Sequence, residues 1–321
     1  MDFEYIKHKL LKNEPLTGTD AVRLLEISSH SDDFYRLLSL ANSLSRTEYG
    51  NKGYIFAQIG LNAEPCSGDC KFCSLAQSRF SVEYPYRLTA DEAVKAGLDI
   101  SKSGISDLFL MTTADYPVDQ FIEIGAKIRA SMPQEVRLVA NIGDFTLLQA
   151  IRLKRAGFTG AYHIRRLNEG TDTAISPDRR IATLDAIREA GLELYYCVEP
   201  IGPEHSYEAL ADEMIRARDY GVSAMAAMRR VPVKGSAMED RGSITLLELT
   251  KIAAVTRLVT RPRRSMNVHE PTEMALLAGV NQLYAEYGAN PRDNLVQTSQ
   301  GRGFRTDKVK QMLENADYTV F

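Results

Sequence analysis

The chain has 321 residues, 44% of them hydrophobic, and a formal net charge of −3. This composition predicts a folded protein with a substantial core, and it offers none of the basic excess that binding to nucleic acid requires. No apolar stretch approaches the roughly 18 residues of a membrane span. The mixed-charge residues 1–15 also lack the apolar segment of a signal peptide, so we expect a cytoplasmic protein without a membrane partner.

Residues 1–50 have the amphipathic pattern of helices. Thr17 and Asp20 are placed to cap a helix that begins with AVRLLEI, and DDFYRLLSLANSLSRTEY at 32–49 predicts a longer one. A turn follows at 51–53. Because no linker separates this region from the rest, we expect a helical cap rather than an independent module.

From residue 54 onward, short apolar runs alternate with amphipathic helices. The predicted strands are 54–61, 106–112, 136–141, 161–165, 192–198, 223–231, 265–268 and 281–287. The predicted helices between and after them are 88–104, 118–132, 144–157, 177–191, 206–221, 245–259 and 269–279. This alternation is typical of parallel βαβ units. Eight such strands predict an α/β fold, a TIM-type (β/α)8 barrel over residues 51–290, with residues 291–321 as a tail packed on the barrel.

Three of the four cysteines, Cys66, Cys70 and Cys73, form the pattern Cys-x3-Cys-x2-Cys. Thiolates at this spacing select zinc or an iron–sulfur cluster. Tetrahedral zinc takes four Cys or His ligands, and no fourth lies nearby in the sequence. A disulfide framework is not expected in a large chain with so few cysteines. In a 4Fe-4S cluster, three ligands would leave one iron open, and the loop follows the first predicted strand, where barrel active sites lie.

This motif, with the aromatic Phe72 before its last cysteine, resembles the hallmark of the radical S-adenosylmethionine (SAM) enzymes. The resemblance implies a 4Fe-4S cluster whose open iron is chelated by SAM. It also implies an electron donor such as flavodoxin or ferredoxin, whose electron cleaves SAM to methionine and a 5′-deoxyadenosyl radical.

Over roughly residues 50–290, the chain is similar to one branch of that family. The branch contains biotin synthase, the iron-only hydrogenase maturase HydE and methylornithine synthase. The similarity is carried by the stretches GLNAEPCSGDCKFCSLAQSRF, RRIATLDAIREAGLE, RRVPVKGSAME and LLAGVNQLYAE.

The resemblance implies roles in SAM binding for residues at the predicted strand ends. Arg180 matches the arginine that pairs with the SAM carboxylate, a task that suits the guanidinium fork. The other implied contacts are Phe72, Ile201, Gly202 and Val231 with the adenine, and Thr112 and Thr113 with the amino group through their backbone carbonyls. A surface charge, a hydrophobic anchor or a strand-end turn would explain the same residues without a cofactor.

Five polar residues are candidates for holding a small-molecule substrate: His163, Arg165, Arg230, Asn267 and His269. Alternation along the fourth predicted strand would place His163 and Arg165 on one side. The arginines indicate a carboxylate on the substrate.

The chain departs from biotin synthase in its remaining thiols. Of the three cysteines that hold that enzyme's second cluster only Cys197 is matched, and one thiol cannot hold a 2Fe-2S cluster. The sequence therefore favours hydrogen abstraction followed by rearrangement or C–C or C–S bond chemistry, in cofactor or amino-acid biosynthesis. Sulfur insertion of the biotin or lipoyl synthase type with an external donor remains an alternative, as does a non-catalytic iron–sulfur electron-transfer protein.

Overall fold

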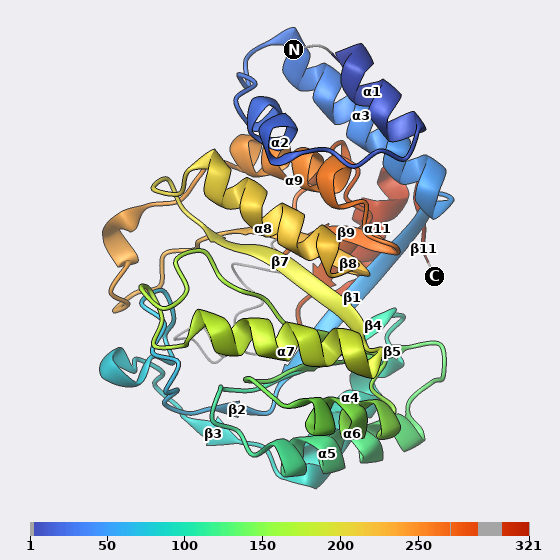
Figure 1. The fold of residues 1–321 in the computed structure, drawn as a ribbon. Coiled ribbons are helices and arrows are strands. Elements are labelled where there is room, and N and C mark those ends of the chain that lie inside the picture. Colours follow the sequence, from blue (N-terminus) through green and yellow to red (C-terminus); the bar gives the residue numbers. More distant parts are fainter. Residues whose placement is uncertain (1–2, 270, 288–303, 321) are drawn as a thin grey trace.

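The computed structural model describes residues 3–269, 271–287 and 304–320. Within them, eight parallel strands close into a barrel (Figure 1). In neighbouring order they are β1 (Lys52–Gly60), β4 (Asp107–Met111), β5 (Arg137–Asn141), β6 (Gly160–Tyr162), β7 (Glu193–Ile201), β8 (Ala224–Arg229), β9 (Ser265–Val268) and β10 (Gln282–Ala285). Pairing of β10 with β1, Tyr54 opposite Gln282, closes the ring and confirms the predicted TIM-type (β/α)8 fold.

Helices alternate with these strands and cover the barrel. They are α4 (Ala90–Ser101), α5 (Val118–Ser131), α6 (Leu147–Arg155), α7 (Pro177–Ala190), α8 (Tyr207–Asp219), α9 (Leu246–Thr260) and α10 (Glu273–Leu276). Two of them start with a capping box. The Thr89 hydroxyl accepts a hydrogen bond from the Glu92 amide, and the Thr89 amide donates to the Glu92 carboxylate; Thr146 and Gln149 repeat this arrangement at α6.

Several predicted elements are shorter in the structure, and two of these differences affect residues near the strand ends. The helix expected at 269–279 is only the four-residue α10, because Pro271 and the N-cap at Thr272 delay its start; residue 270 of that range lies outside the described part. The strand expected at 161–165 ends at Tyr162. The side-to-side alternation assumed for His163 and Arg165 therefore does not apply to them.

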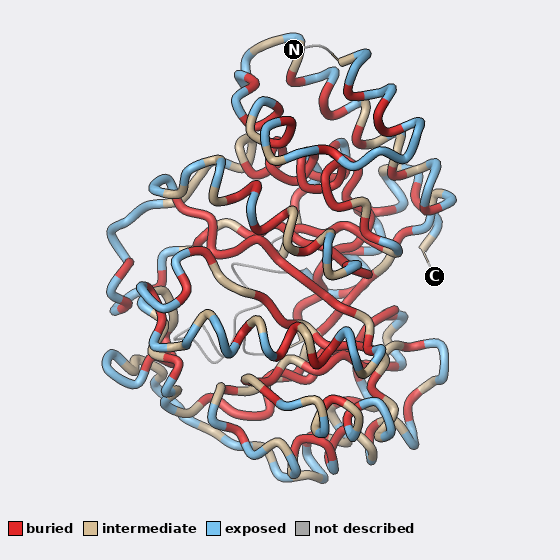
Figure 2. Tube along the Cα trace, viewed as in Figure 1, coloured by how far each residue is buried: buried red, intermediate tan, exposed pale blue. Residues whose placement is uncertain are grey.

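Three helices precede the barrel, α1 (Phe3–Leu11), α2 (Gly18–Leu25) and α3 (Asp32–Tyr49), and α2 and α3 cover the outer face of α9 (Figure 1). Every residue of α9 from Leu249 to Thr260 is buried as a result, and Figure 2 shows it as a continuous red segment. An amphipathic barrel helix would leave one face in water, so α9 depends on the N-terminal helices for cover.

The inside of the barrel is filled by a layer of buried side chains. This layer, called the floor below, consists of Phe56, Phe109, Val139, Tyr195, Ala224 and Tyr284. Beneath it, the fully buried Asp107 accepts hydrogen bonds from Tyr195 (2.8 Å), Arg264 (2.9 Å) and Gln282 (2.9 Å). The floor closes the barrel between its two ends.

The C-terminal residues pack on the same barrel. Helix α11 (Thr306–Asn315) buries Val309, Met312 and Leu313, and strand β11 (Thr319–Val320) pairs with the start of β1.

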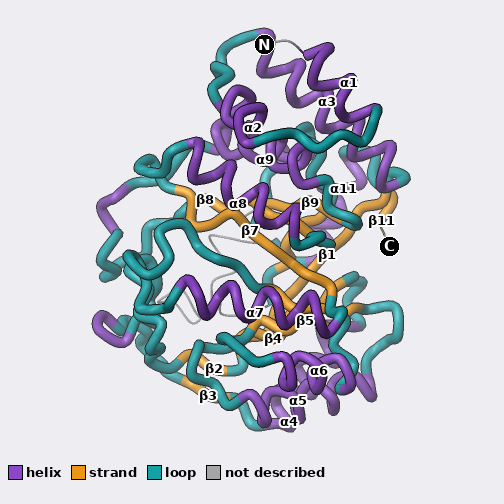
Figure 3. Tube along the Cα trace, viewed as in Figure 1, coloured by secondary structure: helices purple, strands orange, loops and turns teal. Residues whose placement is uncertain are grey.

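The other end of β1 carries the cysteines. A short antiparallel pair, β2 (Asn62–Ala63) with β3 (Tyr86–Arg87), fixes both ends of the loop at 64–85. Figure 3 shows long loops (teal) at this end of the barrel, beside β2 and β3. Among the described helices, none has the length and apolar character that crossing a membrane demands.

Candidate active site

The cysteine loop is folded tightly by its own backbone. The Cys66 amide donates to the Leu75 carbonyl (2.8 Å), and the Cys73 amide donates to the Cys70 carbonyl (3.0 Å). Asp69 adopts a left-handed φ of 43°, and its carboxylate accepts the Ser78 amide (2.9 Å). The positions of the three thiols are therefore set by the loop before anything binds to them.

All three thiols are half-buried and line one hollow at the C-terminal ends of the strands, above the floor. We call this hollow the barrel cavity; its other lining residues include Arg166, Arg180, Asn267 and His269. Backbone amides point at two of the sulfurs, from Ala114 to Cys66 (3.3 Å) and from Leu75 to Cys73 (3.5 Å). Amide donors of this kind stabilise thiolate ligands.

The Cys70 thiol lies in an environment that keeps it protonated until a cation arrives. Burial raises its pKa to about 12, and the nearby Arg166 guanidinium opposes this rise. Thiolates are the metal-binding form, so binding of a cluster would displace this proton.

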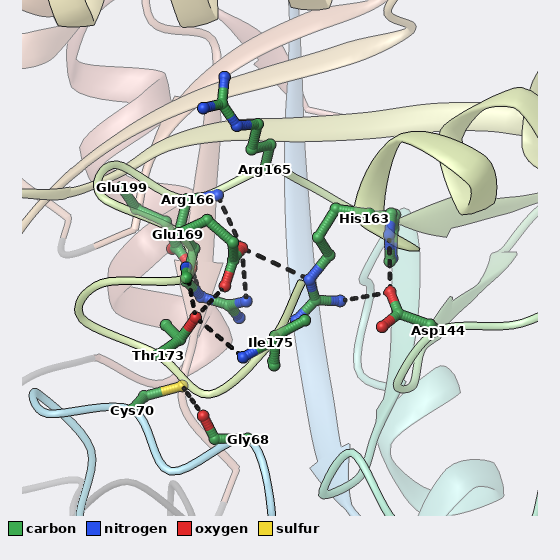
Figure 4. Close-up of polar contacts among 12 residues, drawn as sticks. Gly68, Cys70, Asp144, His163, Arg165, Arg166, Glu169, Thr173, Ile175 and Glu199 are labelled. Atoms are coloured by element: carbon green, nitrogen blue, oxygen red, sulfur yellow. Dashed lines mark hydrogen bonds and ion pairs between the residues drawn. The ribbon is translucent and has the colours of Figure 1, made fainter. Parts of the chain in front are cut away.

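Across the cavity, two arginines are held by three carboxylates (Figure 4). Arg180, on α7, places Nη1 at 3.1 Å from Asp144 and Nε at 3.4 Å from Glu169. Arg166 lies 3.8 Å from Glu169 and 3.6 Å from Glu199. Burial lowers the pKa of Arg180 and the neighbouring Arg166 lowers it further, which shows how crowded the two cations are.

Some of the guanidinium nitrogens in this cluster have no hydrogen-bond acceptor. Nε and Nη1 of Arg166 and Nε of Arg180 are buried and make no hydrogen bond to any described residue, although all three lie near carboxylates. Buried guanidinium donors without hydrogen bonds are costly. They are suited to receive a carboxylate from a bound molecule.

His163 lines the same cavity beside this cluster. It is 2% exposed, and its Nε2 lies 3.4 Å from Asp144. Burial lowers the pKa of His163 well below its usual value, and the cations Arg180 and Arg166 lower it further. The imidazole is therefore neutral at physiological pH, and in this form it has one hydrogen-bond donor and one acceptor.

Of the candidate SAM contacts, Thr112, Thr113 and Arg180 line the barrel cavity. Thr113 is fixed by Asn62, which accepts the Thr113 amide (3.0 Å) and donates to its hydroxyl (2.9 Å). The remaining four candidates, Phe72, Ile201, Gly202 and Val231, do not line the cavity.

The substrate candidates separate into two groups. His163, Asn267 and His269 line the cavity, and His269 stacks on Tyr284 of the floor at 4.7 Å between ring centroids. Arg165 turns away and pairs with Glu213 of α8 at 3.4 Å (Figure 4). Arg230 is buried against Glu204 and the carbonyls of Arg241 (3.1 Å) and Gly242 (3.0 Å).

Arg165 and Arg230 therefore pair with carboxylates and do not line the barrel cavity, and the expectation that they hold a substrate stays a prediction. The cause for Arg165 is the early end of β6, after which the chain turns and brings Arg166 into the cavity instead.

Sequence reasoning missed Arg166, Glu199 and Asn141, which all line the cavity. Asn141 ends the strand β5, and Glu199 is near the end of β7, so a polar residue at a strand end was the available signal for both. The fourth cysteine, Cys197, also lines the cavity from β7 and is buried.

The three thiols fit a cluster better than a single ion. No three His, Cys, Asp or Glu side chains within residues 3–269, 271–287 and 304–320 converge as the ligands of one metal ion do. In an iron–sulfur cube each thiolate binds a different iron, so the sulfurs need only line one wall. Three cysteines lining one cavity, two of them facing backbone amides, meet that requirement.

Comparison with known proteins gives the same picture. No protein-family profile matches the chain. It is 27% identical to a biotin synthase from Acetivibrio thermocellus over 269 residues, which are 81% of this chain and 82% of that protein. Its fold is similar to that of methylornithine synthase, with a TM-score of 0.83, 17% identity and coverage of 98% and 97% of the two chains. The [FeFe]-hydrogenase maturase HydG from Carboxydothermus hydrogenoformans gives 0.81 at 19% identity, covering 99% of this chain and 79% of that one.

A closed parallel barrel with a Cys-x3-Cys-x2-Cys loop after its first strand defines a radical SAM enzyme. Within that class, the sequence similarity extends over 81% of the chain and is to biotin synthase.

Proposed function

We propose that Cys66, Cys70 and Cys73 hold a 4Fe-4S cluster and that the protein uses it to cleave SAM. When bound, the two groups together supply a 5′-deoxyadenosyl radical, which takes a hydrogen atom from a small molecule enclosed in the barrel. The observation that carries the proposal is the shared cavity. The three thiols line the same hollow as Arg166 and Arg180, which carry buried nitrogens without hydrogen bonds to the described residues.

Arg166 and Arg180 are suited to the carboxylate of SAM. Each has a buried Nε that makes no hydrogen bond to the described residues. Glu169 and Glu199 hold these guanidinium groups in place while leaving donors for a ligand. Thr112 and Thr113 follow β4 and line the cavity, and we assign the SAM amino group to this segment.

The remaining polar groups of the cavity would hold the substrate. Asn267 and His269 lie above the floor, and the neutral His163 can donate or accept a hydrogen bond. These groups favour a small substrate with hydrogen-bonding atoms, in cofactor or amino-acid biosynthesis. We place the protein in the cytoplasm, because the reducing environment there keeps the cysteines available.

Sulfur insertion is the second candidate, because Cys197 lines the same cavity. With four cysteines in the chain, three of them assigned to the first cluster, sulfur would have to come from an external donor. Incorporation of labelled sulfur into product in a single turnover distinguishes this outcome from rearrangement.

The test uses anaerobically reconstituted protein. Wild-type protein should bind about four iron and four sulfide and release 5′-deoxyadenosine from SAM under dithionite. Cys70→Ala should lose both properties, while Cys197→Ala keeps its iron. Cleavage of SAM by Cys70→Ala, or tightly bound zinc in place of iron in the wild type, would refute the proposal. Transfer of deuterium from a labelled metabolite pool into 5′-deoxyadenosine would then identify the substrate.

A further inference from the structure

The end of the barrel opposite the cysteines carries a second hollow. Its walls come from the beginnings of strands, with Tyr54 from β1, Arg137 from β5 and Glu193 from β7, and from the last turns of α7. We call it the basal hollow. Its volume is about 650 Å³, a size typical of pockets that hold small molecules. The floor and Asp107 separate it from the barrel cavity, so a molecule bound there does not take the place of SAM or substrate.

Positive side chains outnumber carboxylates around the basal hollow. Two arginines would be enough to neutralise Glu193 and the buried Asp107, and the lining contains more cations than that task requires. The lining carboxylates are Glu48 and Glu193, and the lining cations are Lys52, Arg137, Arg188, Arg263 and Arg264.

The charged groups behind the wall leave this excess of three positive charges, five minus two, unchanged. Two carboxylates and two cations there pair with lining residues, so their charges cancel. The pairs are Asp107 with Arg264, Asp185 with Arg188, and both Arg257 and Arg261 with Glu48.

Three arginines keep N–H donors available at the basal hollow. Among hydrogen bonds to the described residues, Arg264 uses only Nη1, for Asp107, and Arg137 uses only Nη1, for Glu193. Arg263 is exposed, and its guanidinium makes no hydrogen bond or ion pair to the described residues. Each guanidinium has five N–H donors in a planar fork, which matches the oxygens of an anion.

Arg264 is fixed before any ligand arrives. Its guanidinium lies over the ring of Tyr54, 4.0 Å from the centroid, and donates to both oxygens of Asp107 at 2.9 Å. The side chain is only 12% exposed. A cation held in this way loses little conformational freedom on binding, and its partial burial strengthens the attraction for an anion.

We propose that the basal hollow is a binding site for a small phosphate monoester. A phosphoryl group on such a molecule carries close to two negative charges at neutral pH and three strong acceptor oxygens. Arg137, Arg263 and Arg264 can share these oxygens. The hollow is larger than a free phosphate ion needs, and Leu184 and Leu192 provide apolar wall for the organic part of the ester.

The proposal is independent of the proposed function, because the basal hollow contains no residue assigned to the cluster, SAM or substrate. Protein that fails to cleave SAM should therefore still bind the ester. Since the attraction is largely electrostatic and part of it is exposed, binding should weaken as salt increases.

The test is isothermal titration calorimetry of the reconstituted protein at low salt, with glycerol 3-phosphate and inorganic phosphate as separate probes. We expect one molecule of glycerol 3-phosphate to bind per chain, with a Kd at least about threefold lower than that of inorganic phosphate. Arg263→Gln should raise the Kd for glycerol 3-phosphate roughly five- to tenfold, because it removes an unpaired cation. Arg263→Lys keeps the charge and should raise the Kd less.

The matched control is Arg23→Gln, which removes an exposed arginine on α2, away from the hollow. It should bind glycerol 3-phosphate as the wild type does. Four outcomes overturn the proposal: no binding of glycerol 3-phosphate to the wild type, equal Kd values for the two probes, an unchanged Kd in Arg263→Gln, or an equal rise in Arg23→Gln.

Discussion

Arg180 lies between two carboxylates, and its side chain is only 6% exposed. If its fork holds the SAM carboxylate, Arg180→Lys keeps the charge but loses the paired donors. We expect the Kd for SAM to rise about tenfold, with the iron content unchanged. Equilibrium binding to the reconstituted protein measures this. The adjacent Arg179 is exposed, so Arg179→Lys should bind SAM as the wild type does; equal effects in both variants would contradict the role of Arg180.

Gly202 shows how tightly the buried Arg230–Glu204 pair is packed. A Cβ atom at position 202 would lie 2.4 Å from Nη1 of Arg230 and 2.5 Å from Glu204. Gly202→Ala should therefore displace the pair and lower the free energy of unfolding by about 2–4 kcal/mol. Gly18→Ala is the control, because nothing lies within 4 Å of a Cβ there. Urea unfolding compares the two, and equal stability of both variants would contradict the packing argument.

The same pair predicts a pH dependence. Burial acts to raise the pKa of Glu204, but hydrogen bonds from Arg230 prevail and leave it lowered. The stabilisation is therefore complete above the carboxyl's unfolded pKa and is lost as the pH falls through the lower folded value. In Glu204→Gln, the free energy of unfolding should fall less steeply than in the wild type between about pH 5 and pH 3. Parallel curves for the two proteins would show that the pair does not contribute.

Individual residues also mark the limit of prediction from sequence. Cys66, Cys70 and Cys73 could be identified because their spacing carries the chemistry itself. Arg165 and Arg166 could not be told apart, because both are arginines at the end of one strand. Which of them enters the cavity depends on β6 ending at Tyr162, and this is decided by backbone pairing that no local pattern records.

Among the elements, α9 is the one whose surroundings decide its stability. Its residues from Leu249 to Thr260 are all buried, because α3 and its neighbours cover the face that most barrel helices leave in water. The sequence predicts this helix and the helical cap separately. The cover itself is a tertiary contact between segments about two hundred residues apart, so periodicity could not reveal it.

Weakening this cover should destabilise the protein. Leu37 of α3 is fully buried, and Leu37→Ala should lower the free energy of unfolding by about 3 kcal/mol through lost burial and a new cavity. Tyr35 lies on the same helix but is 66% exposed, so Tyr35→Ala should change it by less than about 0.5 kcal/mol. Denaturant titration followed by circular dichroism gives both values, and a small effect at Leu37 would mean that α3 packs loosely.

At the scale of the whole molecule, both ends of the chain brace the barrel. Helix α11 buries Val309 and Leu313, and β11 adds to the sheet beside β1. A chain that stops at residue 303 should lose about 4 kcal/mol of unfolding free energy from the apolar area exposed. Thermal unfolding measures the loss, and Leu313→Ala should fall between the truncated and full-length proteins. An unchanged midpoint on truncation would contradict a bracing role.

The eight-stranded architecture could be predicted because strands and helices alternate with few exceptions. The polar residues that line the cavity could be predicted only in part. The strand ends indicate which end of the barrel holds the site, but they do not indicate which side chains point inward. Arg230 illustrates this. It follows β8 directly, but its guanidinium forms a buried ion pair with Glu204.

The floor of the barrel also determines the route by which molecules can reach the cavity. With Phe56, Phe109, Tyr195 and Tyr284 packed across the interior and Asp107 bound beneath them, nothing can pass through the barrel from end to end. If the substrate binds on the floor and SAM binds above it, both reach the cavity from the same end of the barrel, and the substrate must enter before SAM and leave after it. Such an arrangement predicts compulsory order in the steady-state kinetics, with excess SAM slowing the turnover by shutting the substrate out.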